Sequence, residues 1–411
     1  MCPKRTDTAQ NPGDPLSVSL KEIKEGKVSI LGPKLELYSD KNRIEPCWAP
    51  IFYNPAMEVD RNISVAFLQS FSKAGSKKLR ICDALSATGI RGLRYAKEVE
   101  NVEYVILNDI NKLAYNLIKI NIEKNDLKDI ALPFHSDANV LLAYFAHRGR
   151  RFNVVDIDPF GSPVPFLDNA IRAVENNGLL CVTATDLAPL MGIFQRACIR
   201  KYSAIPIRCV FSREIGLRIL IGYVVKTGAK YGLRVVPLLS YSRGHYMRLF
   251  LKIRTGKKRA DESLDKLGYI TFCPRCGEVQ IGKYSFLLEK KCKNCDSKVK
   301  IGGPLWLGEL CDSIFLKKTV EVFEEFFGRK KEGFKILEKL LNEHGMPPYF
   351  YTTDYIAKTY RFEKEPTLNS IIYSLREMGY KTTHTHFSTK GFKTYANVNT
   401  IVEAFRRASE E

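Results

Sequence analysis

Residues 79–98 read LRICDALSATGIRGLRYAKE, a short apolar strand pattern followed by a glycine-containing turn and the start of a helix. Asp83 stands at the end of the strand, Gly89 and Gly92 flank the turn, and the helix begins near Ile90. Glycine lets the backbone approach a ligand closely, and a helix N-terminus presents free N–H groups. The segment therefore predicts a nucleotide cradle. Its spacing does not fit G-x-G-x-x-G, which disfavours a dehydrogenase.

Strand-like and helix-like patterns alternate on both sides of this segment, from about residue 61 to 190. Alternation of this kind predicts a parallel sheet covered by helices on both faces, an α/β Rossmann-like fold, with the ligand at the carboxyl ends of the strands. The predicted strands are KLRICDAL (78–85), EYVILND (103–109), FNVVDID (152–158) and GLLCVTAT (178–185), and the clearest helices cover 112–125 and 164–177.

Acidic residues stand at the ends of successive predicted strands. Asp109 ends the second strand, where a carboxylate can accept hydrogen bonds from a ribose diol. A further strand candidate, the third along the chain, lies before HSDANVLL (135–142), and Asp137 and Ala138 follow it and suit an adenine edge or amine. A carboxylate before a helix is also a common helix cap, and Asp137 precedes a helix-like run. Together with Asp83 and the glycine turn, the set favours a nucleoside cofactor.

The fourth strand ends in Asp158-Pro159-Phe160-Gly161. A motif of this kind resembles the one with which amino-methyltransferases methylate exocyclic amines of bases. The carboxylate and nearby carbonyls can accept the amine hydrogens, Pro159 stiffens the turn, and Phe160 can stack on an extruded base. The alternative is a plain Asp-Pro turn that ends a strand, with Phe160 in the core.

Four of the eleven cysteines form two C-x-x-C pairs, Cys273/Cys276 and Cys292/Cys295. Two such knuckles at this spacing predict a closed tetrahedral zinc ribbon, in which the metal is structural because no ligand position stays open. A dithiol redox pair needs only one C-x-x-C beside a βα unit. The remaining cysteines are scattered through apolar segments, which is typical of reduced thiols and predicts a cytoplasmic protein.

The chain is strongly basic: 64 Lys and Arg against 45 Asp and Glu give a net charge of +19, and the pI is about 9.3. Such an excess favours polyanionic partners. Residues 243–300 carry 15 basic and 6 acidic residues, interleaved with aromatic residues, which predicts an RNA surface or, alternatively, the solvated face of a small domain. The aromatic residues are Tyr246, Phe250, Tyr269 and Tyr284; Arg196, Arg200, Lys201, Arg208 and Arg213 extend the basic surface.

The other segments give a coarse plan. Residues 1–24 are expected to be a flexible leader, and no apolar run is long enough for a membrane span. Strands are expected at 221–227 (IGYVVKT), 231–242 and 246–254, and one long helix at 313–343. Residues 347–411 have the helix, helix and hairpin order of a winged helix. Its hairpin either grips RNA through Lys381, Lys390 and Lys393 or serves as a scaffold. His384 and His386 favour a polar strand face over a metal site.

Taken together, these motifs closely resemble the tRNA guanine-N2-dimethyltransferase family, whose members convert guanosine at tRNA position 26 to N2,N2-dimethylguanosine. The resemblance runs from about residue 25 to the end. It rests on DALSATGIRG (83–92), LND (107–109), SDAN (136–139), DIDPFGSP (156–163), FYNPAMEVDRNISV (52–65), REIGLRIL (213–220), YGLRVVPLLSYSRGHYMRL (231–249), the four cysteines, GPLWLGEL (303–310) and the C-terminal THF and GFKTYA.

The resemblance implies a class I methyltransferase domain over 25–255 that uses S-adenosylmethionine. It also implies an α+β tRNA-binding domain over 256–411, with the zinc ribbon at about 270–300 and the winged-helix-like segment at 347–411. Cofactor residues would be Asp83, Arg61 (methionine carboxylate), Arg91, Asp109 (ribose), and Asp137 with Ala138 (adenine). Base handling would fall on Asp158, Pro159 and Phe160, with Phe52 as a second aromatic wall. Where the family often has Asn-Arg-Asp, this chain has Arg61-Asn62.

The implied reaction is in-line transfer of one or two methyl groups to the N2 amine of a flipped-out guanosine in tRNA. No obligate protein partner is implied, and a monomer suffices. Two alternatives stay open. One is another base amino-methyltransferase, acting on N6 of adenine or on N2 of ribosomal-RNA guanine, although DPFG differs from the DPPY usual in adenine enzymes. The other is a non-catalytic zinc-ribbon RNA-binding protein, which would need neither the cofactor acids nor DPFG.

Overall fold

The computed structural model describes residues 18–40, 43–75 and 77–410. The chain divides into two compact units. Unit 1 comprises residues 1–159, 165–182 and 318–335, and unit 2 comprises 160–164, 183–317 and 336–411. Of the expected leader, residues 1–17 lie outside the described part of the chain.

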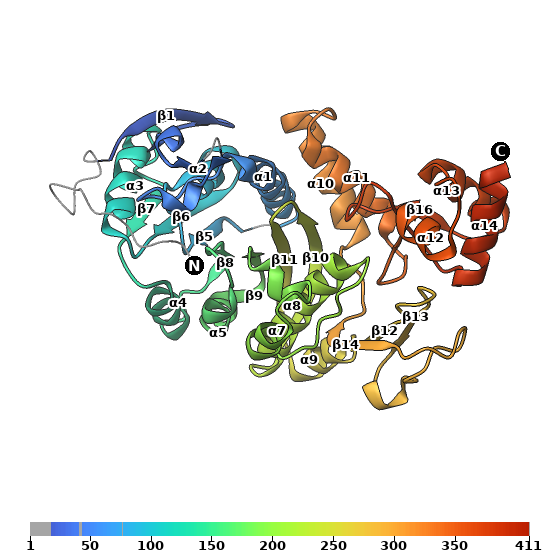
Figure 1. Ribbon diagram of the computed structural model, residues 1–411. Helices are drawn as coiled ribbons and strands as arrows, with labels where there is room; N and C mark the ends of the chain where they lie inside the picture. Colours follow the sequence, from blue (N-terminus) through green and yellow to red (C-terminus); the bar gives the residue numbers. More distant parts are fainter. Residues whose placement is uncertain (1–17, 41–42, 76, 411) are drawn as a thin grey trace. The chain divides into compact units, whose positions relative to one another are not determined.

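Unit 1 is built on five parallel strands in the order β9-β8-β5-β6-β7. Helices α1 to α3 cover one face of this sheet, and α4 and α5 lie on the other (Figure 1). The predicted Rossmann-like α/β fold is confirmed. The strands are β5 (Leu79–Asp83), β6 (Val102–Asn108), β7 (Ala131–Phe134), β8 (Phe152–Ile157) and β9 (Val174–Ala184). The helices are α1 (Glu58–Lys73), α2 (Ile90–Glu98), α3 (Lys112–Lys124), α4 (Ala138–His147) and α5 (Val164–Ala173).

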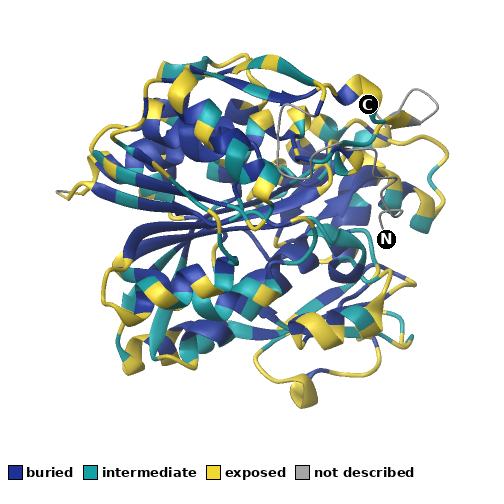
Figure 2. Ribbon diagram, turned by 90° about the vertical axis from the view of Figure 1, so that its left-hand side faces the viewer, coloured by how far each residue is buried: buried dark blue, intermediate teal, exposed yellow. Residues whose placement is uncertain are grey.

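Burial explains why these strands read as continuous apolar runs. Every residue of β8 is buried, and β5 and β6 are buried over their carboxyl-terminal halves. A strand with helices on both faces has no solvent side, so its sequence loses the alternation of a half-exposed strand. In Figure 2 the strands are dark blue along most of their length, whereas many helices turn a yellow face outward.

An antiparallel pair, β1 (Leu20–Glu25) and β2 (Val28–Pro33), precedes the sheet. The expected end of the leader at residue 24 is therefore wrong, because β1 already starts at Leu20. A buried ion-pair cluster holds the carboxyl end of β1. Its last residue, Glu25, accepts hydrogen bonds from Arg61 at 2.6 Å and from Arg94 at 2.9 Å. Short elements follow: η2 (Leu35–Leu37), β3 (Ser39–Asp40), β4 (Arg43–Ile44), η3 (Pro46–Trp48) and η4 (Pro55–Met57).

Unit 2 begins with helices, and the longest of them corrects one expectation. Residues 221–227, expected as a strand, lie inside α8 (Ser212–Ala229). Nearly every residue from 212 to 228 is buried, so the helix has no polar stripe and its β-branched run resembles a buried strand. The neighbouring elements are α6 (Leu187–Leu190), α7 (Gln195–Tyr202), α9 (Lys257–Leu264) and the antiparallel pair β10 (Leu233–Arg243) and β11 (Tyr246–Thr255).

The rest of the chain contains a small sheet and a helix–hairpin segment. The small sheet has the order β13-β12-β14, with β12 (Leu267–Phe272), β13 (Val279–Gly282) and β14 (Lys300–Trp306); η5 (Ser285–Leu287) lies between β13 and β14. The tail contains β15 (Tyr351–Thr352), α12 (Thr353–Tyr360), α13 (Leu368–Glu377), β16 (Thr382–His384), β17 (Gly391–Thr394) and α14 (Val398–Glu410).

The single helix expected at 313–343 is wrong. Two helices, α10 (Ser313–Phe327) and α11 (Glu332–Glu343), occupy this stretch. The break falls at Gly328, whose φ of +81° is a left-handed conformation that glycine adopts without steric cost and that ends a helix.

Candidate functional site

The acidic residues predicted at strand ends lie at one edge of the unit 1 sheet. Asp83 is the last residue of β5, Asp109 directly follows β6, and Asp158 directly follows β8. Because β5 pairs in parallel with both β6 and β8, the carboxyl ends of these strands are neighbours. Asp137 stands at the same edge, between β7 and α4. The structure therefore brings these four carboxylates to a common rim.

The glycine turn between β5 and α2 has the tight geometry that its sequence predicts. Gly89 is the N-cap of α2 with a φ of +81°. A Cβ atom at Gly92 would lie 2.6 Å from Cδ2 of Leu107 and 3.2 Å from Oδ2 of Asp83, so a larger residue there would have to displace the Leu107 side chain. The Gly92 N–H donates to Asp83 Oδ2 at 3.1 Å, which fixes the carboxylate against the first turn of the helix.

Asp109 and Asp137 both bind backbone N–H groups. Asp109 accepts from the N–H groups of Ala87 and Asn111, each at 2.8 Å, and so links the glycine turn to the start of α3. Burial raises its pKa. Asp137 caps α4 by accepting from Asn139 at 2.8 Å, the alternative role that its position suggested. Its role in binding a nucleoside, and that of the neighbouring buried Ala138, stays a prediction.

Arg91 is held against the DPFG motif. Its guanidinium donates to Asp60 at 2.7 Å and forms a second ion pair with Asp158. Arg91 itself is buried, whereas the Asp158 side chain is 22% exposed. Nearby, Tyr95 donates its hydroxyl to Asp156 at 2.7 Å. The partially exposed carboxylate is thus oriented by a buried arginine.

Several carboxyl groups surround the single guanidinium of Arg91 at the rim. Burial raises the pKa of Asp83 to about 7, and repulsion from Asp156 adds to the effect, while Arg91 lowers the pKa. Asp60 and Asp158 are both paired with the same arginine. A site with this charge favours a cationic ligand.

Arg61, to which the resemblance assigned the methionine carboxylate, stands inside α1, and its side chain is nearly fully buried. Its Nε and Nη2 groups each donate to Glu25 at 2.6 Å, and Nη2 also donates to the carbonyl oxygen of Asn54 at 3.2 Å. This arrangement makes Arg61 an anchor for β1 and does not present it to a ligand. Phe52, just upstream, is partly exposed.

The turn after Asp158 leaves Phe160 in solvent. Pro159 is buried, but Phe160 is 71% exposed, so the alternative that Phe160 belongs to the core is wrong. Within unit 2, the next residue is fastened: Gly161 donates its N–H to Thr185 Oγ1 at 2.7 Å and accepts from the Thr185 N–H at 2.9 Å. The exposed ring of Phe160 is therefore carried by a turn whose backbone is held in place by hydrogen bonds.

Sequence reasoning overlooked the residues that fasten this turn. Besides Thr185, Ser162 lies 2.9 Å from the hydroxyl of Tyr202, which donates to Asp186 at 2.6 Å. Thr185 and Asp186 directly follow β9. Because ligands of a parallel sheet bind at the carboxyl ends of its strands, this position marked them as candidate site residues in the same way as Asp83, Asp109 and Asp158.

The four cysteines of the predicted ribbon converge. Their sulfur atoms all lie within 4.8 Å of one another. Two of the Sγ–Sγ distances are 3.5 Å, between Cys273 and Cys295 and between Cys276 and Cys292. A tetrahedral zinc ion with Zn–S bonds of about 2.3 Å needs sulfur atoms about 3.8 Å apart. The four thiols therefore fit a structural zinc ion with no open position.

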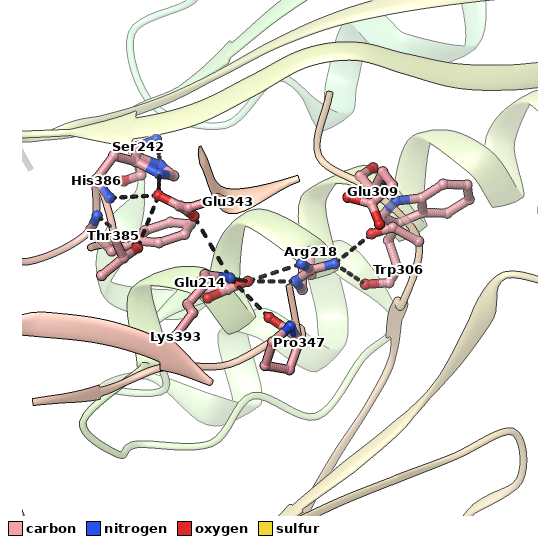
Figure 3. A network of polar contacts seen from close by, with 12 residues as sticks. Glu214, Arg218, Ser242, Trp306, Glu309, Glu343, Pro347, Thr385, His386 and Lys393 are labelled. Atoms are coloured by element: carbon pink, nitrogen blue, oxygen red, sulfur yellow. Dashed lines mark hydrogen bonds and ion pairs between the residues drawn. The ribbon is translucent and has the colours of Figure 1, made fainter. Parts of the chain in front are cut away.

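The C-terminal hairpin is fastened by a buried polar network (Figure 3). Lys393 of β17 donates to Glu214 of α8 at 2.6 Å, and Glu214 also pairs with Arg218 at 2.9 Å. On the other side, Glu343 accepts from the N–H and ring of His386 at 2.6 and 2.7 Å. The contacts of Lys393 therefore favour a scaffold role for the hairpin over an RNA contact. His386 is engaged by a carboxylate and offers no metal site with His384.

The basic and aromatic stretch at 243–300 is only partly a surface. Tyr246 and Phe250 are fully buried in β11, so the prediction that they face RNA is wrong. The strands β10 and β11 pack against α8 and α9, and the aromatic rings of β11 belong to the core between them. Tyr269 is half-buried and Tyr284 is exposed. The exposed aromatic surface is therefore confined to the segment around residue 284.

The chain matches a family described as N2,N2-dimethylguanosine tRNA methyltransferase over residues 34–406. A tRNA (guanine(26)-N(2))-dimethyltransferase of Methanobrevibacter smithii is 38% identical over 95% of this chain and 98% of its own length. Its counterpart in Thermococcus kodakarensis is 40% identical over 95% and 100% of the two chains.

A solved structure is similar along nearly the whole chain. The complex of Trm1 from Pyrococcus horikoshii with S-adenosyl-L-methionine is 39% identical, covers 94% of this chain and 99% of its own, and has a TM-score of 0.82. None of the described helices combines the length and apolar character that crossing a membrane requires.

Proposed function

Because the chain belongs to the N2,N2-dimethylguanosine tRNA methyltransferase family, we propose that it transfers methyl groups from S-adenosylmethionine to the N2 amine of guanosine 26 in tRNA. The observation that carries this proposal is the rim of unit 1. A partly exposed carboxylate, Asp158, stands beside the end of β5, where Asp83 and the Gly89 turn would form a nucleotide cradle.

The donor would lie across the ends of β5, β6 and β7. Asp109 keeps lone pairs for a ribose diol beyond its two backbone contacts, and the next residue, Ile110, is 64% exposed and offers an apolar face to the adenine. Asp137 and Ala138 would contact the adenine edge. The negative rim around Asp83 suits the cationic donor. Arg61 is omitted from this donor site because Glu25 occupies its guanidinium.

The bound donor supplies an electrophilic methyl group on a sulfonium. Asp158 would accept a hydrogen bond from the guanine N2 amine and so direct the nitrogen lone pair at the methyl carbon. As the N–C bond forms, the C–S bond breaks, S-adenosylhomocysteine leaves, and the amine proton passes to Asp158 or water. Arg91 keeps this carboxylate oriented. Most of the rate would come from in-line positioning.

A guanine within a stem is not accessible to such a site, so the base must leave its stack. Phe160, exposed on the fastened DPFG turn, and Phe52, exposed before α1, are the aromatic faces proposed to hold it. Unstacking costs a few kcal/mol, which aromatic stacking partly offsets. Two successive transfers on one nitrogen would yield the dimethylated base.

The proposed division of the chain at residue 255 is kept, with catalysis in the part before it, which starts at β1 (Leu20) and not at residue 25, and with tRNA binding in 256–411. In the second part, zinc on the four cysteines would hold β12, β13 and β14 together around the knuckles, and the helix–hairpin tail would be a scaffold. The metal would have no chemical step.

The test is Asp158→Asn, which keeps the size of the side chain and removes its charge. Asp129→Asn is the matched control, because Asp129 is exposed just before β7, at the opposite edge of the sheet. Each variant is incubated with an unmodified tRNA transcript and labelled S-adenosylmethionine, and the nucleosides are separated by mass spectrometry.

The control should form N2,N2-dimethylguanosine at the wild-type rate, and Asp158→Asn should lose at least about 100-fold in turnover while it still binds tRNA. Wild-type turnover in the Asp158 variant would remove the proposed catalytic group. Label on N6 of adenosine would favour the adenine alternative, and no label from the wild-type protein would leave only RNA binding.

A further inference from the structure

The zinc ribbon ends in an exposed apolar tip. Between β13 and β14 the chain forms a long loop that contains the short helix η5 (Figure 1). Phe286 is 80% exposed, Leu287 66% and Tyr284 47%. Single exposed apolar residues are ordinary, but three within four positions are a patch that another surface should cover.

The two aromatic rings of the tip are stacked on each other. Tyr284 and Phe286 stack with their centroids 5.4 Å apart and an angle of 18° between the rings. Backbone hydrogen bonds from Leu287 to Tyr284 and from Leu288 to Ser285, both 3.2 Å, hold the turn, and Leu288 itself is buried against the ribbon. The rings therefore form a preset flat surface.

The charge around the tip selects its partner. From residue 283 to 300 there are six lysines and two acidic residues, a net charge of +4 over eighteen positions. One of the lysines, Lys283, lies 5.9 Å above the ring of Tyr284. Aromatic rings among lysines are the usual platform for unpaired nucleotides, because the bases stack on the rings and the phosphates meet the cations. An apolar protein partner would gain nothing from this charge.

A hollow of about 490 Å³ borders the same tip. Ser285 of the tip lines it, together with Tyr269 of β12 and the partly exposed Ile199 and Ile205. Backbone hydrogen bonds of 2.8 Å in both directions between Ile205 and Gly303 hold the opposite wall to β14. The hollow is large enough for a nucleoside and is lined mainly by apolar side chains, as sites for flat ligands are.

We propose that the ribbon tip and this hollow bind an unpaired nucleotide of the tRNA other than the methylated guanosine. The base would stack on Tyr284 and Phe286 or enter the hollow. The bases of an A-form stem are not accessible for stacking, so the contact must fall on a loop, bulge or chain end. The proposal rests on the proposed function only in taking tRNA as the RNA.

The experiment compares the full-length double variant Tyr284→Ala/Phe286→Ala with Tyr373→Ala, a matched control on α13 whose ring is 59% exposed. Kd is measured by fluorescence anisotropy at one fixed salt concentration for two probes, an unmodified tRNA transcript and a stem duplex without unpaired nucleotides. The affinity for S-adenosylmethionine and the bound zinc are measured alongside to verify that the variants are folded.

The double variant should bind the tRNA roughly 5- to 150-fold more weakly, the range that loss of one stacked base gives, while its Kd for the duplex stays unchanged. Tyr284→Phe/Phe286→Trp should restore tRNA binding, because any flat ring provides a stacking face. Tyr373→Ala should bind both probes as the wild type does.

Unchanged tRNA affinity in the double variant would overturn the proposal and leave the tip to a protein partner. Equal losses for tRNA and duplex would also overturn it, because they would indicate a contact through charge alone. Both results are read from binding and need no turnover. They are therefore distinct from a failure of the proposed methyl transfer, which the Asp158→Asn assay would reveal.

Discussion

We predict that Asp83 makes the affinity for S-adenosylmethionine depend on pH. Its carboxyl group is buried, and burial together with Asp156 raises its pKa from 3.8 to about 7. A cationic donor beside it should favour the ionised form and lower this pKa. At pH 6 only about a tenth of the free protein carries ionised Asp83, and at pH 8 about nine-tenths does. The Kd for S-adenosylmethionine should therefore fall about tenfold from pH 6 to pH 8.

The variant Asp83→Asn isolates this effect. An amide oxygen can still accept the N–H of Gly92, so the glycine turn keeps its shape, but the titrating group is gone. Isothermal titration calorimetry at pH 6, 7 and 8 should show the tenfold change for the wild type and a flat profile for the variant. At pH 7 the wild type should release about half a proton on binding, which appears as a dependence of the heat on the buffer.

The pH dependence of the free energy of unfolding tests the raised pKa of Asp83 independently, and the raised pKa fixes its direction. A buried acid whose pKa is raised stabilises the fold only while it is protonated, so stability falls as the pH rises from about 4 to about 7. The pKa difference corresponds to about 4 kcal/mol at most. Asp83→Asn should thus unfold at higher denaturant concentration than the wild type at pH 8 and at a similar one at pH 4. A wild-type Kd that is flat from pH 6 to 8, or an equally steep profile in the variant, would refute the reasoning.

Two further predictions concern the rest of the chain. Metal analysis should give about one zinc per chain, and a strong chelator should loosen the ribbon, seen as new protease cleavage between 267 and 306; a folded ribbon without metal would contradict the site. Burial raises the pKa of Glu343, but His386 and Lys393 outweigh it and lower the pKa to about 2, so its stabilising effect, about 3 kcal/mol, should disappear as the pH falls from about 4.5 to 2. In urea titrations, the Glu343→Gln variant should no longer lose stability as the pH falls from about 4.5 to 2. If the variant loses as much stability as the wild type, the lowered pKa of Glu343 is not the cause.

Much of the unit 1 rim follows from local sequence. Strand ends are marked by the change from β-branched apolar residues to Asp and Gly, so Asp83, Asp109 and Asp158 were found from the pattern alone. The cysteine spacing likewise predicted a cluster that the structure bears out. The donor and base contacts of these residues remain predictions, because the chain pattern shows where a carboxylate stands and not what it binds.

Other residues were misjudged because their surroundings come from distant segments. Arg61 looked like a ligand for a carboxylate, but Glu25, 36 positions upstream, already binds it. For Lys393 the sequence left an RNA contact and a scaffold role open, and a buried ion pair with Glu214, 179 positions away, favours the scaffold. An isolated motif carries no record of such partners. Only the fold decides whether a charged side chain meets solvent, a ligand or another side chain.

By itself, the sequence of this protein determined the alternation of strands and helices along the chain, the acids at the strand ends and the ribbon cysteines, and its motifs resemble those of the family. The first three features depend on periodicity and spacing within a few tens of residues, whereas the order of the strands in the sheet is seen only in the structure. The tertiary structure decided which of the aromatic and basic residues are exposed: Tyr246 and Phe250 are buried, and Phe286 is in solvent. Exposure depends on what packs over a residue, and that is settled only when segments far apart in the chain come together.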